Sequence, residues 1–488
     1  MKAAVRRARR ERRAITALAA VAALRVLLLS AAFPFFDQVD EHQHMDTVHR
    51  WSRGELPGRD PVHLRDPVVD WALRFGTFEY LEPNPPPPYL ARRGAGPESP
   101  WLPRVRAAYQ GVLNQEAESP PVYYAVAALW YRLGETWLGD LDLLLWVRAL
   151  NALALGALVW WSHVWLRRWA PGDRLLHWGA PALLAFFPQD AFYGIGPDGF
   201  SALVGGLAFA AAVEAARPLP RPGRSDGLAG VAVALAFLTK YTNLVYAGLL
   251  GLALALRHRT AGESPRRVLL RLAWAGGASA TLAGGWLLRN QLVVGDALGT
   301  ARKIAHLEWT PLPLSALLSQ PIFRPSGLLE WAPETLALFW RGEFRWLGEP
   351  MTLAGLDPAL AGVSLLLLAC GSVSAWRAAR RGTWLEPLAW LATVGGFASL
   401  AVLSARFEFA DWGNPTRAHP YFTEGRLVLG VLLPFVVVFV RGLAVACARL
   451  PSAAPVALLG AWIAYVSLTD WLLAAAAFAS PWNWIHSP

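Results

Sequence analysis

The chain of 488 residues contains only two cysteines, Cys370 and Cys447. Both fall in apolar runs, so we expect neither a disulfide nor a metal site built on cysteine ligands. The sequence also has no internal repeat, no heptad pattern and no low-complexity tail. These absences exclude repeat architectures and coiled coils.

Charged residues are scarce as well, at 16% of the chain, whereas hydrophobic residues make up 55% and the mean hydropathy is +0.32. Apolar runs of about 20 residues recur, which is the length that a helix needs to cross a bilayer. The net charge of +10 could suggest a nucleic-acid partner. However, the arginines gather in short segments between apolar runs, as the positive-inside rule predicts for cytoplasmic loops. We therefore expect an all-α polytopic membrane protein with membrane lipids and no nucleic acid as partners.

The apolar runs predict a bundle of about 11 transmembrane helices. The basic stretch at residues 1–13 predicts a cytoplasmic N-terminus, and no small-residue cleavage site follows, so the first run is expected to be retained. Arg25 within it should face other helices or reach toward the membrane surface. The run at 226–256 is too long for one span, and we expect two short helices that turn near Lys240. The expected spans are 14–34, 142–166, 175–192, 198–216, 227–239, 241–256, 268–288, 353–376, 384–404, 426–447 and 454–477.

The spans divide the chain into three parts. An N-terminal membrane module at 1–288 includes a large first external loop at 34–141, a second external loop covers 289–352, and C-terminal transmembrane helices follow at 353–488. Within the first loop, the apolar segment Val122–Leu138 is short and rich in Tyr and Trp, which is typical of a helix that lies at the membrane interface. Function is expected where the outer loops meet the helix ends.

Acids and histidines gather at 37–57, directly after the first span. In a helix, Asp37, Asp40, Glu41 and His44 would share one face. Asp40 could serve as a general base, because a carboxylate in a partly dry external cleft can take a proton from a hydroxyl acceptor. Glu41 is the second candidate for this role, and His44 is a supporting or substrate-binding residue. Equally, Asp37 and Asp40 could be a capping pair at the start of a helix.

A third interpretation makes Asp40, Glu41 and His44 the ligands of a divalent cation. Carboxylate and imidazole groups at positions i, i+3 and i+4 can converge on one ion. We expect no other cofactor.

Several cations are placed at outer helix ends, against the positive-inside trend: Lys240, Arg289, Arg417 and Arg426. A phosphate-bearing lipid would need such cations, because Arg and Lys donors stabilise the negative charge that builds on a departing phosphate. Alternatively, they reach toward the membrane surface or pair with acids such as Glu424.

Asp190 and Asp198 lie at the outer ends of two successive spans. Asp198 follows Pro197, so it could cap the next helix. The alternative is that one of these acids orients substrate hydroxyl groups opposite Asp40.

The order of these features resembles the GT-C superfamily of polyprenyl-phosphate-sugar-dependent glycosyltransferases, especially the branch that contains protein O-mannosyltransferases and lipid A aminoarabinose transferase. The resemblance covers most of the chain. Its motifs are Asp40-Glu41-x-x-His44 with Gly54-Glu-Leu-Pro57, Ser119-Pro-Pro-Val-Tyr-Tyr124, Pro197-Asp198, Arg289-Asn290 with Gly295-Asp296, and Glu424-Gly-Arg426.

The resemblance implies an inverting glycosyltransferase that moves a sugar from a polyprenyl-phosphate donor to a hydroxyl group of a lipid, glycan or protein. It implies that Asp40 is the base and that Lys240, Arg289 and Arg426 hold the donor phosphate. The site would lie on the outer face of the bacterial cytoplasmic membrane, in the cell envelope. The chain departs from the family pattern at two positions. Leu427 follows Arg426 where the family usually has Tyr, and Ser119 stands where protein O-mannosyltransferases have His.

A lipid or sugar transporter, or a flippase, is the alternative from another functional class. In such a protein the charged groups would line a passage, and transport sites usually lie near the membrane midplane. Here the ionisable residues collect toward one face, and the middle of the spans is nearly free of Asp, Glu and Lys. This pattern favours the enzyme.

Overall fold

The computed structural model describes residues 2–77, 79, 83–84, 88, 100, 102–217, 223–260 and 262–486. Part of the predicted first external loop, at 78, 80–82, 85–87, 89–99 and 101, lies outside these residues. The described chain is almost entirely helical. Its α-helices are α1 (Lys2–Ala32), α2 (Glu41–Ser52), α3 (Asp66–Phe75), α4 (Leu102–Gln110), α5 (Pro121–Glu135), α6 (Asp140–Trp169), α7 (Arg174–Ala185), α8 (Pro197–Ala215), α9 (Arg224–Phe237), α10 (Val245–Thr260), α11 (Pro265–Val293), α12 (Ala301–His306), α13 (Pro325–Arg341), α14 (Leu356–Arg380), α15 (Leu385–Ala405), α16 (Leu432–Ala446) and α17 (Ala454–Ala479).

Short 3-10 helices and strands connect these helices. The 3-10 helices are η2 (Asp190–Phe192), η3 (Tyr241–Leu244), η4 (Leu314–Ser319), η5 (Pro321–Phe323) and η6 (Gly425–Val431). The strands are β1 (Thr310–Pro311), β2 (Arg345–Trp346), β3 (Glu349–Pro350) and β4 (Phe407–Glu408). β1 pairs antiparallel with β4, with Thr310 opposite Glu408, and β2 pairs antiparallel with β3. The β1–β4 pair joins the predicted second external loop to the segment that follows α15.

Within the described ranges, seven helical segments are long and apolar enough to cross a membrane, as expected of an integral membrane protein. They are Ala8–Ala32, Asp140–Trp169, Pro197–Ala215, Leu356–Arg380, Leu385–Ala405, Gly425–Ala446 and Ala454–Ala479.

The other four predicted spans are helical too, as α7, α9, α10 and α11. α7, α9 and α10 have 12, 14 and 16 residues, which at about 1.5 Å per residue is less than the roughly 30 Å of a bilayer core. α11 has 29 residues, but its middle, rich in Gly and Ala, is less apolar. The helix does break near Lys240, between α9 and η3, as the sequence predicted.

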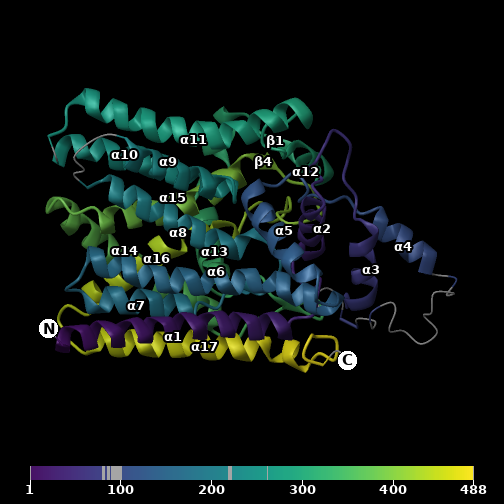
Figure 1. Cartoon of the computed structure of the whole chain (residues 1–488), viewed down its shortest axis with the longest axis horizontal. Coiled ribbons are helices and arrows are strands. Elements are labelled where there is room, and N and C mark those ends of the chain that lie inside the picture. The colour runs from purple at the N-terminus through teal and green to yellow at the C-terminus, as the bar shows by residue number, and fades with distance from the viewer. Residues whose placement is uncertain are drawn as a thin grey trace.

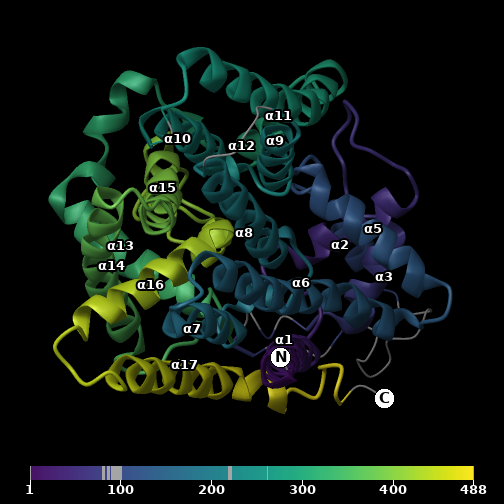
Figure 2. The ribbon, with the colours of Figure 1, turned by 60° about the vertical axis from the view of Figure 1, so that its left-hand side comes forward.

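The long helices lie side by side, and the segments between them gather at the two ends of this bundle (Figure 1). α2, α3, α4 and α12 lie together at one end, whereas the N-terminus lies at the opposite end. α1 packs against α6, α9 against α11, and α14 against α16. α16 crosses the middle of the bundle between α7 and α8, as the turned view shows (Figure 2). The end that carries α2 to α4 is called the loop end below.

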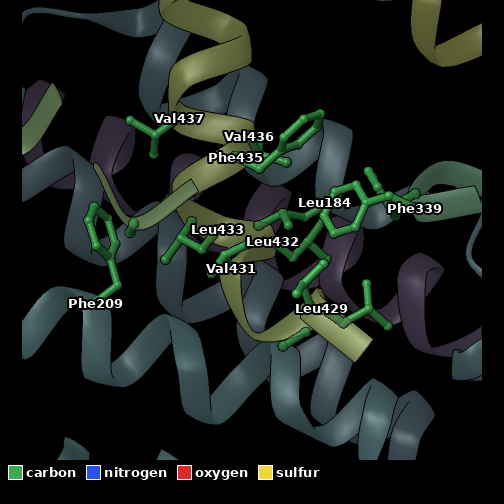
Figure 3. Close-up of a cluster of buried hydrophobic side chains, with 14 of the residues drawn as sticks. Leu184, Phe209, Phe339, Leu429, Val431, Leu432, Leu433, Phe435, Val436 and Val437 are labelled. Carbon is green, nitrogen blue, oxygen red and sulfur yellow. The ribbon is translucent and has the colours of Figure 1, made fainter. Parts of the chain in front are cut away.

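The hydrophobic core surrounds α16 and η6. Leu432, Leu433 and Phe435 are fully buried, and side chains from α7, α8 and α13 surround them (Figure 3). α16 is apolar on all sides, as is typical of a helix that is buried all round. Gly205 of α8 lies against η6: a Cβ atom there would lie 2.2 Å from the carbonyl oxygen of Gly430. Only glycine allows this approach, which brings η6 and its charged start against α8.

Arg25 faces other helices, in agreement with the first of the two expectations for it. Its guanidinium group is buried and lies 2.5 Å from the carboxylate of Asp470 on α17. It also donates hydrogen bonds to the Tyr193 hydroxyl and to the carbonyls of Ala185 and Phe187. Full pairing makes a charge tolerable inside a bundle.

A second buried ion-pair network joins α9, α10 and α11 at the end opposite the loop end. Arg271 of α11 donates to Asp226 at 2.9 Å and to Glu263 at 2.9 Å. Arg257 of α10 also donates to Glu263, at 2.9 Å. These three helices are therefore held together as a unit.

The segment after α17 folds back onto the first external loop. Ser480 donates a hydrogen bond to Glu79 at 2.6 Å, and the Trp484 indole donates to Asp142 at 2.9 Å. The Trp484 amide donates to the Ala31 carbonyl, at the end of α1, at 3.1 Å. Residues 480–486 thus connect the end of α17 to the end of α1, to the start of α6 and to the segment around Glu79.

Candidate active site

A cavity of about 1930 Å³ opens at the loop end of the bundle. Its walls come from the start of α2, the segment before α5, the first turn of α8, the turn between α9 and α10, α12, α13, α15 and the start of η6. Asp40, Asp198, Lys240 and Arg426 are among its lining residues. His44 lines it too, so five of the predicted site residues, from widely separated motifs, are brought to one cavity.

Asp40 lines this cavity and is partly exposed. It immediately precedes α2 and adopts a left-handed backbone conformation with φ 59°, which Asp tolerates better than most residues. Its carboxylate makes no capping hydrogen bond to α2. Asp37, the predicted cap, instead accepts a hydrogen bond from the Thr77 hydroxyl. The capping alternative for these two acids is therefore not realised.

Glu41 is buried and does not line the cavity. Its two carboxylate oxygens each accept a hydrogen bond of 2.7 Å from Arg148 of α6. The backbone amides of Phe36 and Ile195 donate to it as well, both at 2.9 Å. These four hydrogen bonds satisfy the carboxylate. Glu41 therefore anchors the start of α2 to α6 and to the segments at Phe36 and Ile195.

The prediction that Asp37, Asp40, Glu41 and His44 share a helical face is wrong, because α2 begins only at Glu41. Asp37 and Asp40 lie before the helix, where the helical spacing does not apply. Asp40 therefore points to the cavity while its neighbour Glu41 points to Arg148.

His44 is buried, and its Nδ1 atom is hydrogen-bonded to the Tyr124 hydroxyl at 2.8 Å. Burial lowers the pKa of His44 to about 4, although the carboxylate of Glu116 opposes this shift. The imidazole is therefore neutral near pH 7.

The predicted metal site on Asp40, Glu41 and His44 is not supported. In the part of the chain that the structure describes, no three His, Cys, Asp or Glu side chains are grouped so that they could hold a metal ion. Glu41 is held by Arg148, and His44 is held by Tyr124. The three side chains thus have separate partners and do not converge.

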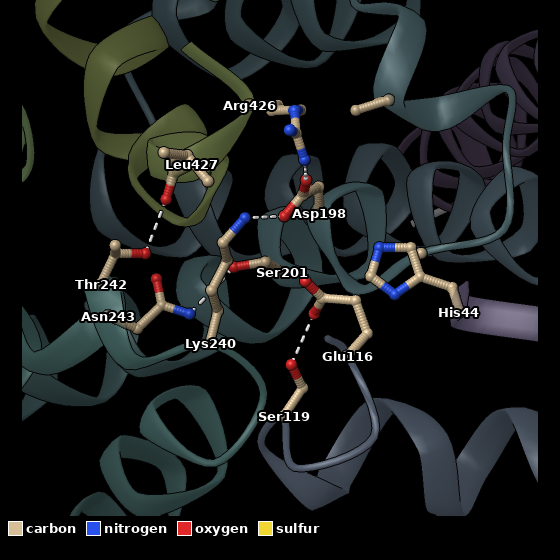
Figure 4. A network of polar contacts seen from close by, with 12 residues as sticks. His44, Glu116, Ser119, Asp198, Ser201, Lys240, Thr242, Asn243, Arg426 and Leu427 are labelled. Carbon is tan, nitrogen blue, oxygen red and sulfur yellow. Dashed lines mark hydrogen bonds and ion pairs between the residues drawn. The ribbon is translucent and has the colours of Figure 1, made fainter. Parts of the chain in front are cut away.

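Lys240 and Arg426 both reach the carboxylate of Asp198 (Figure 4). The Arg426 guanidinium lies 3.2 Å from Asp198 and 3.1 Å from Glu343 on its other side. Pro197 occupies the first turn of α8, which places Asp198 at the N-terminus of that helix, where negative charge is stabilised. We call Asp198, Lys240 and Arg426 the charge triad.

Hydrogen bonds around the triad fix the elements that carry it. Thr242 of η3 donates to the carbonyl of Leu427 at 2.6 Å, and Asn243 donates to the Ser201 hydroxyl of α8 at 2.9 Å (Figure 4). η3, η6 and α8 are therefore held together. The break in the helix after α9 is what brings Lys240 to this junction.

Arg289 does not line the cavity. It donates to the carbonyl of Pro57 and to the Asn290 side chain, and it lies over the Trp286 ring at 5.4 Å. Arg417 is exposed and lies 3.3 Å from Asp411. The position of Arg289 at the end of a helix was predicted, but its side chain turns away from the charge triad.

Lys303 lines the cavity and was missed by the sequence reasoning. It belongs to α12 in the second external loop and lies 2.5 Å from the carboxylate of Glu116. Burial disfavours the charged form of Lys303, but the neighbouring carboxylate of Glu116 outweighs this effect and raises the pKa of Lys303. In the same way, burial disfavours the charged form of Glu116, but Lys303 outweighs this effect and lowers the pKa of Glu116. The chain has three lysines, Lys2, Lys240 and Lys303, and two of them line this cavity; that scarcity was the available signal.

One side of the cavity is apolar. Its lining comes from η3, α10 and α15, and several of its leucines are exposed at the molecular surface: Leu244 (59%), Leu252 (39%) and Leu391 (39%). The strip is therefore open to the side of the bundle. We call it the apolar groove; it includes Leu244, Val245, Gly248, Leu249, Leu252, Leu391, Gly395, Ser399 and Leu403.

No family model and no curated protein matches the chain. Among solved structures, an apo archaeal oligosaccharyltransferase from Archaeoglobus fulgidus aligns with a TM-score of 0.41 and 12% identity, over 95% of this chain and 56% of that one. The oligosaccharyltransferase AglB of the same organism, in complex with an inhibitory peptide and a dolichol-phosphate, aligns with a TM-score of 0.44 and 13% identity. That alignment covers 96% of this chain and 56% of the other. The chain thus spans little more than half the length of either structure.

Proposed function

We propose that the protein is an inverting glycosyltransferase of the GT-C type, which moves a sugar from a polyprenyl-phosphate donor to a hydroxyl acceptor. One observation carries this proposal: a single cavity joins a carboxylate that has no capping role, a group of cations and an apolar groove open to the side. A lipid-linked sugar phosphate has the complementary parts, namely a reactive sugar, an anionic link and a hydrocarbon tail.

Asp40 is the general base of the proposed reaction. Its carboxylate takes the proton of the acceptor hydroxyl, and the acceptor oxygen forms a bond to the anomeric carbon. The bond between that carbon and the phosphate oxygen breaks, and its electron pair stays on the phosphate. Attack opposite the leaving group inverts the configuration. The partial exposure of Asp40 and its place on the cavity wall support this role.

Lys240 and Arg426 hold the phosphate and stabilise the charge that develops on it as it leaves. Asp198 keeps the two cations side by side and so acts as a positioning residue. The earlier alternative, in which Asp198 orients substrate hydroxyl groups, is less favoured because both of its oxygens already face cations.

The polyprenyl chain occupies the apolar groove between α10 and α15. Small residues such as Gly248 and Gly395 line the groove beside leucines, so an extended hydrocarbon chain can lie against the helices. Burial of apolar surface supplies the affinity, at roughly 25 cal/mol per Å².

The site faces the outside of a bacterial cytoplasmic membrane. This proposal rests on the arginines, since the segments 167–174, 257–271 and 377–381 carry many of them at the end opposite the cavity. The transporter alternative is less favoured, because the ionisable pair inside the bundle, Arg25 with Asp470, is fully engaged with its own partners.

The test uses purified protein in nanodiscs with synthetic polyprenyl-phosphate mannose, glucose and aminoarabinose as donors and with an alkyl glycoside or water as the hydroxyl acceptor. It measures the release of polyprenyl phosphate. Wild-type protein is expected to release it with at least one donor, and Asp40→Asn is expected not to. The exposed Asp411→Asn serves as the matched control. The proposal fails if no donor is turned over. Loss of release in the presence of a chelator would show that the reaction needs a divalent cation.

A further inference from the structure

Besides the apolar groove, the cavity is lined by carboxylates from three segments of the chain. Glu334 comes from α13, Glu343 from the segment after α13, and Glu424 directly precedes η6. Asn414 and His419, from the segment between β4 and η6, line the same cavity. We call these five residues the acidic wall.

Most carboxylate oxygens of the acidic wall have protein partners. Glu343 lies 3.1 Å from Arg426. Glu334 accepts a hydrogen bond of 3.2 Å from the Thr423 hydroxyl and lies 3.3 Å from the His419 ring. These groups are therefore engaged within the protein.

Glu424 is the exception. The side chain is 4% exposed, and one of its oxygens accepts a hydrogen bond of 2.7 Å from Asn414. The other oxygen, Oε2, is buried and has no hydrogen-bond partner among the described residues. It does not cap η6 either. A buried carboxylate oxygen without a donor is destabilising and rare in native structures, so it calls for an explanation.

A donor that lacks an acceptor lies nearby. The indole nitrogen of Trp309 is buried and has no acceptor in the described part of the chain, and Trp309 lines the same cavity. Its ring packs against Phe422, two residues before Glu424, with 5.4 Å between ring centroids. Glu424 and Trp309, both of which line the cavity, thus have one unused acceptor and one unused donor.

Arg426 links this wall to the charge triad. It lies between Asp198 on one side and Glu343 on the other. A phosphate bound by Lys240 and Arg426 would be repelled from the acidic wall, because like charges repel. The sugar is bonded directly to that phosphate, so its ring must lie next to Arg426. Hydroxyl groups both donate and accept hydrogen bonds, as the wall requires.

We propose that the acidic wall is the subsite for the transferred sugar, in which Glu424 Oε2 accepts a hydrogen bond from one ring hydroxyl and the Trp309 indole donates to another. This inference rests on the proposed function. Glu424 is a specificity-determining residue in this account, because a sugar that lacks the hydroxyl leaves the buried carboxylate without its donor.

The first experiment compares donors on wild type, Glu424→Ala and Glu424→Gln. Each polyprenyl-phosphate sugar that the wild type uses is paired with its single-position deoxy analogues. For one position, wild-type kcat/KM is expected to fall at least about tenfold on loss of the hydroxyl. Glu424→Ala is expected to use both donors equally. The Gln variant has a single acceptor oxygen, so keeping the Asn414 contact puts an amide NH2 group in the place of Oε2. It is therefore expected to lose most of the preference as well, and it tests the subsite even if the Ala variant misfolds.

The control is Glu330→Gln, which removes an exposed acid of α13 that lies 3.4 Å from His419 and does not line the cavity. This variant should keep the wild-type preference. The subsite assignment is overturned if both Glu424 variants discriminate as the wild type does.

A second experiment is independent of turnover. Saturation-transfer NMR with methyl mannoside, methyl glucoside and methyl galactoside measures sugar binding to the protein in nanodiscs. Binding by wild type and Glu330→Gln, but not by Glu424→Ala, is expected. If the wild type binds none of the glycosides, or if the Ala variant binds equally well, the subsite is wrong. A third outcome is possible: sugar binding depends on Glu424, but no donor releases polyprenyl phosphate. That outcome would overturn the proposed reaction and still support the sugar subsite.

Discussion

The charges inside the helix bundle and the charges around the cavity differ in how completely they are paired. Arg148 donates to both oxygens of Glu41 and to three backbone carbonyls, and Arg25 has an equally complete set. Around the cavity, Glu424, Trp309 and Arg406 each keep a buried polar atom that no described residue satisfies. In these examples the fully paired arginines hold the fold, whereas the unsatisfied polar atoms beside the cavity can still form a hydrogen bond to a ligand.

The largest effect is expected from breaking a saturated pair. Arg148→Met would leave the buried carboxylate of Glu41 uncompensated, at a cost of about 3–5 kcal/mol. That is a large share of the roughly 5–15 kcal/mol that stabilises a typical protein. We expect the variant to accumulate poorly and to give no monodisperse peak in detergent chromatography.

Arg53→Met is the matched control, because Arg53 pairs with Glu135 at the surface, where its side chain is 44% exposed. A normal yield and melting temperature for Arg148→Met would contradict the structural role of the Arg148 pair.

Asp40→Asn should instead leave the fold intact and remove activity. Asn tolerates the left-handed backbone conformation as well as Asp does, so no strain is added. Loss of a general base lowers the rate by about 10²–10⁴-fold. The measurement is the release of polyprenyl phosphate at equal amounts of folded protein. Turnover by Asp40→Asn at the wild-type rate would contradict the assignment of Asp40 as the base.

The cations sharpen the same comparison. Lys240→Met and Arg426→Met should each lower kcat by about 100-fold, because they remove donors to the departing phosphate. Arg289→Met removes an arginine outside the cavity and should change kcat by less than about threefold. Equal losses in all three variants would show that the cavity does not select among these cations.

The smallest effect concerns pH. Burial, together with Glu343, raises the pKa of Glu424 to about 7. The folded state therefore binds this proton more tightly than the unfolded state, and the stability that it contributes is lost as pH rises through about 7. Between pH 6.5 and 8 we expect this loss to lower the melting temperature of the wild type by about one degree relative to that of Glu424→Gln.

Asp190 contributes in the same direction, because burial also raises its pKa to about 7. The slope in Glu424→Gln should therefore shrink without disappearing. His44 acts in the opposite direction, since burial lowers its pKa to about 4, but it does so equally in the wild type and in Glu424→Gln. An unchanged slope in Glu424→Gln would contradict the raised pKa of Glu424.

That Asp40, Asp198, Lys240 and Arg426 lie at the same end of the bundle could be predicted from the sequence, because the alternation of spans placed all four there. It could not be predicted which residues of that end reach the cavity, since Arg289 was placed by the same reasoning and does not line it.

The difference between Asp40 and Glu41 could not be predicted either. It depends on the residue at which α2 begins. Asp40 lies just before the helix and lines the cavity, whereas Glu41 is the first residue of the helix and contacts Arg148.

Pairings between distant segments were also beyond the sequence pattern. Lys303 reaches the cavity because α12 of the second loop lies against Glu116 of the first loop. Arg289 turns away because Pro57 accepts its hydrogen bond. Neither partner is local in sequence, so no spacing rule could find it.

The contacts of residues 480–486 bear on the order in which the molecule can be assembled. Chains are synthesised from the N-terminus, and early segments can fold before late ones exist. Here Glu79, Asp142 and the end of α1 receive hydrogen bonds from Ser480 and Trp484. The segment around Glu79 and the end of α1 therefore reach their final packing only after residues 480–486 have been synthesised and α17 is in place.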